Sequence, residues 1–176
     1  MKASVYIGTS LDGFIAREDG DIGWLTKFAD DDAVEAYNEF ISGVDSIIIG
    51  RGTFETVLSF SDWPYQKRVF VLSSSLTELP DQLTERASLI SMRPRQVLDH
   101  LSNLGFRSAY IDGGNVIQSF LEEDLIDELT IATVPVLLGS GIPLFGRLSH
   151  DLDFERRRTT TFSNGIVRSY YSRAKR

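Results

Sequence analysis

The sequence has no cysteine and only two histidines, His100 and His150, which lie far apart in the chain. Without cysteine, disulfide bonds, thiol nucleophiles and thiolate metal sites are all excluded. Two isolated histidines do not form the clustered ligand set that a bound metal needs. We therefore expect no metal site in this protein.

Long hydrophobic runs are also missing. The longest, at 47–49 and 134–138, are far shorter than the roughly 20 residues that a transmembrane helix needs. The first residues do not form a signal peptide, because Asp12 and Gly13 interrupt the apolar segment. We expect no membrane partner and a cytoplasmic location.

Positive charge is in deficit. The chain has 18 Lys and Arg against 25 Asp and Glu, a formal net charge of -7, which argues against a nucleic-acid partner. The run Arg156–Arg158 is expected on the outward edge of a hairpin, where charge discourages edge pairing. The terminal segment 173–176 is expected to fray.

Apolar residues, by contrast, recur along the whole chain and make up 42% of its 176 residues. A chain of this size buries roughly 70% of its unfolded surface and is most simply one domain, residues 1–176. The chain is therefore long enough to build a substantial core around one functional cleft.

Hydrophobic periodicity predicts strands that alternate with helices. The expected strands are 2–10, 45–50, 68–73, 88–92, 108–112 and 128–134, and the expected helices are 30–42, 53–60, 94–104 and 115–122. Within the first helix, Val34, Tyr37, Phe40 and Ile41 share one face. Segments 154–162 and 166–171 flank Asn164-Gly165, which favours a tight hairpin. The prediction is an α/β three-layer sandwich with a mostly parallel central sheet and an antiparallel C-terminal hairpin.

A pair of glycines, Gly113 and Gly114, separates the strand 108–112 from the helix 115–122. Glycines at such a corner let the backbone approach a ligand closely. The first N–H groups of the new helix then offer a site for a phosphate. The alternative is a tight turn that needs glycine for its geometry alone.

A second corner, Gly50-Arg51-Gly52-Thr53, follows the buried strand 45–50. Arg51 can bind a phosphate through two N–H groups, and Thr53 can cap the helix or contact a phosphate oxygen. The alternatives are a solvated Arg51 and a Thr53 that only caps. Strand 68–73 leads into further small hydroxyls, Ser73–Ser75, and such strand ends are where α/β sheets bind nucleotides.

Neither standard nucleotide-binding fingerprint occurs. No Gly-x-Gly-x-x-Gly follows the first strand, and there is no Gly-x-x-x-x-Gly-Lys-Ser/Thr. A doubly wound dehydrogenase and a P-loop enzyme are both disfavoured. Any nucleotide must bind through a different set of corners.

The combination of these segments resembles the dihydrofolate reductase superfamily, and more closely the riboflavin-biosynthesis reductase family (RibD C-terminal domain-like). The resemblance covers nearly the whole chain. Its motifs are Ser10–Ala16, Gly20, Trp24–Thr26, Gly50–Glu55, Val71–Ser74, Ile111–Gly114 and Pro135–Gly141.

The resemblance implies NADPH as cofactor and hydride transfer to a pterin-like or aminopyrimidine heterocycle of the 5-amino-6-ribosylaminouracil type. It places Ile15 and Ala16 beside the nicotinamide, and it places Gly50, Arg51 and Thr53 at cofactor phosphates. It places Leu72, Ser73 and Ser74 at the adenosine part. The residues that it places at the pyrophosphate are Gly113, Gly114, Asn115, Val116 and Ile117.

The substrate side rests on five candidates. Asp12 and Glu35 are the candidate catalytic carboxylates, since a partly buried acid can supply a proton beside the hydride acceptor. Trp24, Thr26 and Tyr37 are the candidate substrate-binding residues. The alternatives are a turn former for Asp12, a solvated helix face for Glu35, and core positions for Trp24 and Tyr37.

Two other functions stay open from the sequence. One is true dihydrofolate reduction, and the other is a nucleotide-binding module without turnover. The resemblance also implies a homodimer, for which the hairpin edge and exposed aromatic side chains are candidate contacts. The partner expected in every case but the module is a small heterocyclic substrate.

Overall fold

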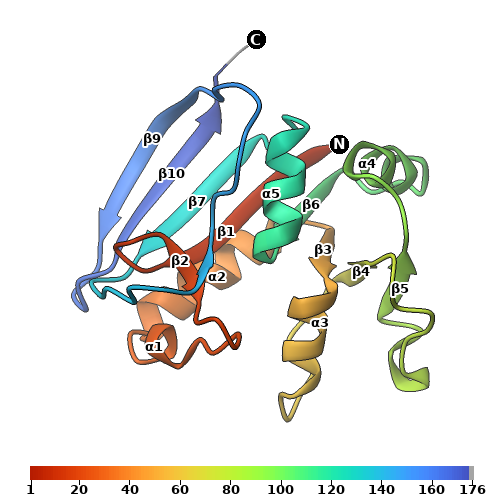
Figure 1. Cartoon of the computed structure of the whole chain (residues 1–176), viewed down its shortest axis with the longest axis horizontal. Helices are drawn as coiled ribbons and strands as arrows, with labels where there is room; N and C mark the ends of the chain where they lie inside the picture. The colour runs from red at the N-terminus through yellow and green to blue at the C-terminus, as the bar shows by residue number, and fades with distance from the viewer. Residues whose placement is uncertain (175–176) are drawn as a thin grey trace.

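An eight-stranded sheet forms the centre of the computed structural model, which describes residues 1–174 (Figure 1). Its strands lie in the order β5-β4-β3-β6-β1-β7-β10-β9. Their bounds are β1 Lys2–Thr9, β3 Ser46–Gly50, β4 Arg68–Leu72, β5 Ala87–Ile90, β6 Ser108–Asp112, β7 Glu128–Thr133, β9 Phe154–Thr161 and β10 Val167–Arg173. From β5 to β7 all neighbours are parallel, and β10 and β9 complete the sheet as an antiparallel hairpin. The predicted fold is confirmed.

Helices cover both faces of the sheet. In Figure 1, α5 (Gly114–Glu122) lies in front of the sheet and α2 (Asp31–Ser42) behind it. The buried cluster that includes α5 also takes in α4 (Pro94–Asn103). The cluster on the opposite face joins aromatic side chains of α2 to Phe54 of α3 (Arg51–Leu58). The sheet is therefore buried between two helical layers.

Strand β3 shows why a parallel sheet buried on both faces reads as a continuous apolar run. Ile47, Ile48 and Ile49 are all fully buried. Ile48 belongs to the cluster of α4 and α5, whereas Ile47 and Ile49 belong to the cluster of α2 and α3. Alternation along one strand thus joins the two layers into a single structure.

Two details of the predicted helices are wrong. α3 begins at Arg51, two residues earlier than expected, because Gly50 is extended and serves as the N-cap. Val34 is 51% exposed rather than buried. The buried stripe of α2 is centred on Ala36, Tyr37 and Phe40, and Val34 lies more than a quarter-turn away from it.

Four short elements had no sequence signal. They are β2 (Phe14–Ala16), α1 (Gly23–Thr26), the 3₁₀ turn η1 (Asp81–Leu83) and β8 (Ile142–Pro143). β2 and β8 pair with each other as a separate antiparallel ladder. Within residues 1–174 no helix has both the length and the apolar character to cross a bilayer.

The C-terminal hairpin agrees with its sequence in part. β9 is the outer strand, and Arg156–Arg158 are exposed on it as predicted. Arg173 does not fray, because it ends β10 and its Nε atom lies 2.8 Å from Oδ1 of Asp124. Residues 175–176 of the expected fraying segment lie outside the described residues.

The corner between β6 and α5 depends on Gly113. Its φ of +92° lies in the region that residues other than glycine rarely adopt. A Cβ atom at this position would also overlap Oγ1 of Thr53 in the first turn of α3. The two glycine corners therefore touch each other.

Replacing Gly113 by alanine is expected to destabilise the fold more than the same change at Gly105. Gly105 has a similar φ of +94° but open space around it, so both variants carry the cost of a side chain at positive φ, of order 1–3 kcal/mol. Only Gly113→Ala adds the overlap with Thr53. Urea unfolding of the two variants measures the difference, and equal losses would contradict the close contact.

Candidate active site

A cavity of about 1150 Å³ opens at the carboxyl ends of the parallel strands. The corners after β3, β4 and β6 line it together with residues of β1, β2, α1, α2 and α3. The corners that the sequence singled out therefore share one cleft.

Two helices begin at this cleft without a side-chain cap. The N-caps are Gly50 for α3 and Gly113 for α5, and neither has a side chain that can accept a hydrogen bond. By contrast, Asp30 caps α2 by accepting a hydrogen bond from the backbone N–H of Ala33 at 2.9 Å. The first N–H groups of α3 and α5 are thus left for another acceptor, and the helix dipoles favour an anionic one.

Arg51 lies in the first turn of α3 and extends toward the end of β4. Its Nη1 atom donates a hydrogen bond to Oγ of Ser75 at 3.1 Å, and its Nε atom lies 3.4 Å from Oε1 of Glu55. Both charged side chains are about half exposed. The guanidinium is therefore held over the β4 corner while part of it stays open to a ligand.

The β4 corner itself is organised by Ser73. This buried hydroxyl accepts hydrogen bonds from the backbone N–H groups of Ser75 and Leu76, at 3.2 and 3.1 Å. Leu72, Ser73 and Ser74 all line the cleft. Small side chains with a fixed backbone leave room there for a flat ligand.

Most of the other predicted cofactor residues also line the cleft. Gly50, Thr53, Gly113, Gly114, Asn115 and Val116 do so, as do Ile15 and Ala16 of β2. A Cβ atom at Gly114 would lie 3.0 Å from Cδ1 of Ile15, so glycine is what lets β2 approach α5. Ile117 is the exception, because it is fully buried in the core between α5 and the sheet.

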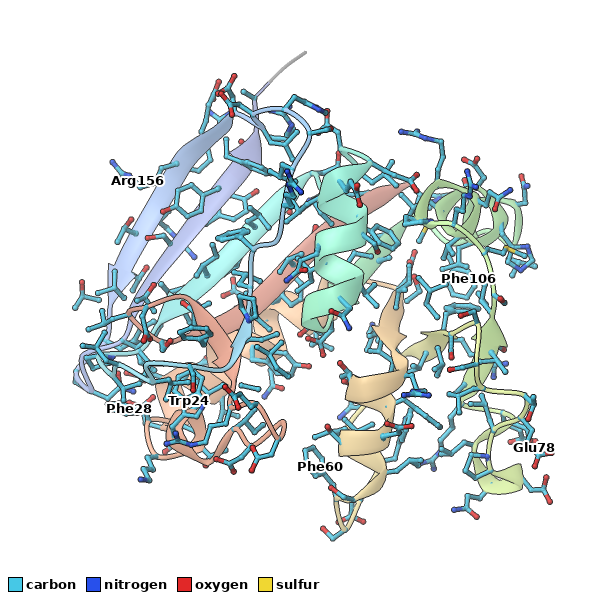
Figure 2. The ribbon with its side chains drawn as sticks, viewed as in Figure 1. Trp24, Phe28, Phe60, Glu78, Phe106 and Arg156 are labelled. Atoms are coloured by element: carbon cyan, nitrogen blue, oxygen red, sulfur yellow. The ribbon has the colours of Figure 1, made fainter. Side chains whose placement is uncertain are left out.

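Of the predicted substrate-binding residues, only Tyr37 lines the cleft. Trp24 is 4% exposed and packs with Val134 and Ile166, and Figure 2 shows it beside Phe28 at the α1 end of the molecule. Thr26 is exposed, and its hydroxyl donates to the carbonyl oxygen of Gly23 at 3.1 Å. Trp24 is therefore a core residue, which was the alternative to a role in substrate binding.

Neither predicted catalytic carboxylate lies in the cleft. Glu35 is exposed on α2 outside it. Asp12 accepts hydrogen bonds from the backbone N–H groups of Leu138 and Gly139, at 3.1 and 2.7 Å. A hydrogen bond from Ser10, together with these two, lowers the pKa of Asp12 to about 2. Asp12 thus fastens the loop after β7 to the β1–β2 turn as a carboxylate.

A carboxyl group that was not predicted, that of Asp112 at the end of β6, does line the cleft. Oδ2 accepts a hydrogen bond from the hydroxyl of Tyr65 at 3.2 Å, and Oδ1 accepts one from the backbone N–H of Gly113 at 2.8 Å. Burial raises the pKa of Asp112, although these hydrogen bonds favour the carboxylate and act in the opposite direction. A carboxyl group with a raised pKa in a cleft is a candidate proton donor.

Tyrosine side chains surround this carboxyl group. Tyr6, Tyr37, Tyr65 and Tyr110 all line the cleft. The rings of Tyr6 and Tyr37 meet edge to face at 5.6 Å, and the hydroxyl of Tyr110 donates to the carbonyl oxygen of Tyr6 at 2.9 Å. Burial raises the pKa of Tyr37 well above its ordinary value, and the negative charge of Asp112 adds to this shift, so the hydroxyl of Tyr37 stays protonated. The result is an aromatic wall suited to a flat ring.

Asp112 was not among the site residues expected from the sequence, although the motif Ile111–Gly114 contains it. The available signal was an acidic residue at a strand end, directly before the paired glycines Gly113 and Gly114. The tyrosines gave no such signal, because they come from four separate segments that only the fold brings together. Within residues 1–174 there is no group of three or more His, Asp or Glu side chains able to hold a metal ion.

The sequence of residues 4–168 matches the protein-family model of the RibD C-terminal domain. The chain belongs to the RibD C-terminal domain family. YwjB of Bacillus subtilis (strain 168) is 36% identical over 172 residues, which cover 96% of this chain and 97% of that protein.

Solved structures agree with this membership. A protein from Shewanella sp. PV-4 named for riboflavin biosynthesis is 40% identical, with a TM-score of 0.94 over 99% of this chain and 100% of its own. The Thermotoga maritima diaminohydroxyphosphoribosylaminopyrimidine deaminase/5-amino-6-(5-phosphoribosylamino)uracil reductase has the same fold, with a TM-score of 0.77 at 15% identity. The match covers 98% of this chain but 56% of the Thermotoga chain.

The raised pKa of Asp112 gives stability a definite dependence on pH. Its folded-state pKa lies above the ordinary 3.8, so its contribution to stability is complete below that value and is lost as the pH rises through the folded-state pKa. Asp112→Asn removes this loss while keeping an oxygen for the N–H of Gly113. Urea unfolding from pH 4 to 7 is expected to show the variant gaining stability relative to the wild type as pH rises. A difference in unfolding free energy between variant and wild type that does not change with pH would contradict the raised pKa of Asp112.

The contribution of Asp12 to stability depends on pH in the opposite direction. Its folded-state pKa of about 2 lies below 3.8, so its contribution is present above pH 3.8 and is lost as the pH falls toward 2. Asp12→Asn is expected to speed amide hydrogen exchange at Gly139 near pH 6, because the amide loses its charged acceptor. Unchanged exchange at Gly139 would show that the loop is held by other contacts.

Proposed function

We propose that this protein is a reductase that uses NADPH to deliver a hydride to a pterin-like or aminopyrimidine heterocycle. The observation that carries the proposal is that one cleft combines two features. The first is a pair of helix N-termini without side-chain caps, and the second is a wall of tyrosine side chains next to the carboxyl group of Asp112. The first feature suits the pyrophosphate of a dinucleotide, and the second suits a flat ring with amino groups. Family membership supports the same reading.

The residues present fit a nicotinamide dinucleotide. Gly50 lies so close to α5 that a Cβ atom there would be 2.9 Å from Cγ2 of Val116, whereas a Cβ atom at Gly52 would meet nothing within 4 Å. Gly50 thus keeps the two helix N-termini close, and Gly52 leaves free space in the first turn of α3. When bound, the nicotinamide would supply the hydride, and Ile15 and Ala16, which line the cleft, would shield its ring from water.

Asp112 is the proposed proton donor. Hydride addition to a carbon–nitrogen double bond leaves the nitrogen to take up a proton, and a positioned acid accelerates such a step. Burial keeps a proton on Asp112 to higher pH, while Tyr65 and the N–H of Gly113 fix the orientation of its carboxyl group. Tyr37 and Tyr6 hold the ring of the substrate beside it.

Arg51 is the proposed contact for the 2′-phosphate of NADPH. Arg51→Ala is expected to weaken NADPH binding by about 1.5–3 kcal/mol, roughly 10- to 150-fold, because a charged hydrogen bond is lost. NADH, which lacks that phosphate, is expected to change much less. Calorimetric titration of both nucleotides measures the two effects, and Arg86→Ala is the matched control, since Arg86 is exposed outside the cleft. Equal weakening of both nucleotides would assign Arg51 to the pyrophosphate instead.

Asp112→Asn is expected to lower turnover roughly 10²- to 10⁴-fold with little change in NADPH affinity, because the amide cannot donate an acidic proton. The wild-type rate is expected to fall as pH rises through the pKa of Asp112, and the variant is expected to lack this limb. Steady-state rates of NADPH oxidation across pH give both results. A variant with wild-type turnover would remove Asp112 from the chemistry.

The substrate scan with the wild type tests the function as a whole. Oxidation of NADPH by aminouracils or pterins supports the proposal, and oxidation by dihydrofolate alone would assign dihydrofolate reduction. Tight NADPH binding without oxidation by any of these compounds would instead leave a nucleotide-binding module.

A further inference from the structure

Charge is unevenly distributed along the cleft. Its charged lining residues are Glu18, Asp19, Arg51, Glu55 and Asp112, so that within residues 1–174 a single cation stands among four acidic side chains. That cation, Arg51, is already engaged by Ser75 and Glu55. A ligand that enters the cleft therefore meets a positively charged side chain at one place, apart from the partial positive charge of the two helix N-termini.

Arg51 and the tyrosine wall lie at different ends of the cleft. The Arg51 head group contacts Ser75 beyond the end of β4, whereas Tyr6 lies on β1. In the sheet β4 and β1 are separated by β3 and β6. Three strand spacings of about 4.8 Å place the two ends roughly 14 Å apart. The guanidinium is thus at the adenosine end of the proposed cofactor site.

The acidic side chains Glu18 and Asp19 line the cleft without coming from any of the strand-end corners. They are exposed in the segment between β2 and α1, next to Gly20. A Cβ atom at Gly20 would lie 3.9 Å from Oγ1 of Thr56, which places this segment against α3. In Figure 2, Phe60, another lining residue, stands at the far end of the same helix. Two carboxylates therefore line the cleft beside α3, and among the described residues that line it Arg51 is the only basic side chain.

We propose that the substrate of this protein is an unphosphorylated amino-heterocycle, neutral or cationic, and that the phosphate ester of the same compound is rejected. A phosphate monoester carries roughly -1.5 to -2 charge at neutral pH. With Arg51 assigned to the cofactor, such a group would meet no other basic side chain among the described residues that line the cleft, and the carboxylates of Glu18 and Asp19 would repel it. The proposal rests on the proposed function, because that function assigns Arg51 to the cofactor. It separates this chain from the Thermotoga protein, whose name specifies a phosphoribosylamino substrate.

A matched pair of compounds tests the proposal, namely 5-amino-6-ribosylaminouracil and its 5′-phosphate. Each is titrated calorimetrically into the full chain saturated with NADP⁺, and each is also assayed for oxidation of NADPH. The unphosphorylated compound is expected to bind at least tenfold more tightly, about 1.4 kcal/mol, and the gap is expected to narrow as salt screens the repulsion. Equal or tighter binding of the phosphate, or binding of neither compound, would overturn the proposal.

Charge reversal at Glu18 locates the effect. Glu18→Lys is expected to improve binding of the phosphate at low salt by roughly tenfold and to leave the unphosphorylated compound nearly unchanged. Glu35→Lys makes the same change of charge on α2 outside the cleft and is the control. An equal gain in both variants would mean that net charge alone governs binding, and the role of Glu18 would be rejected.

Titration with NADPH alone distinguishes a failure of the proposed function from a failure of the proposed substrate class. If NADPH binds and the phosphate ester is the better substrate, the proposed function stands and the substrate class is wrong. If NADPH does not bind, the proposed function fails and the substrate class fails with it, because Arg51 is then free to receive a substrate phosphate.

Discussion

The contact between Gly113 and Thr53 is the constraint on which the rest of the site depends. It brings the corner after β6 against the first turn of α3, so that two helices with no side-chain cap begin at the same place. Unsatisfied N–H groups and the positive ends of two helix dipoles then face one volume. A larger side chain at position 113 would separate these N-termini and remove the anion-binding character of the cleft.

The two aspartates show how environment, not residue type, assigns chemistry. Asp12 lies three residues after β1, and Asp112 is the last residue of β6 in the same sheet. Asp12 is exposed and receives several hydrogen bonds, so it is ionised and serves to hold a loop. Asp112 is enclosed by tyrosine rings, and desolvation outweighs the hydrogen bonds that it receives. Only the second environment raises the pKa of the carboxyl group.

Much of the fold and part of the site could be predicted from the sequence, for local reasons. A continuous apolar run such as Ile47–Ile49 identifies a buried strand, and paired glycines after a strand identify a corner. Predictions failed where the outcome depended on which way a helical side chain points. Ile117 turns into the core, and Glu35 turns outward, although each stands close in sequence to residues that line the cleft.

The sequence by itself determined the alternation of strands and helices, the hairpin at Asn164-Gly165 and the corners at Gly50 and Gly113, because each depends on contacts within a few residues. The tertiary structure alone decided which carboxyl groups line the cleft and which side chains surround Asp112. Tyr6, Tyr37, Tyr65 and Asp112 come from separate elements, and only the packing of α2 and the segment after α3 against the sheet brings them together. The pKa of an acid follows from that enclosure, and no local pattern records it.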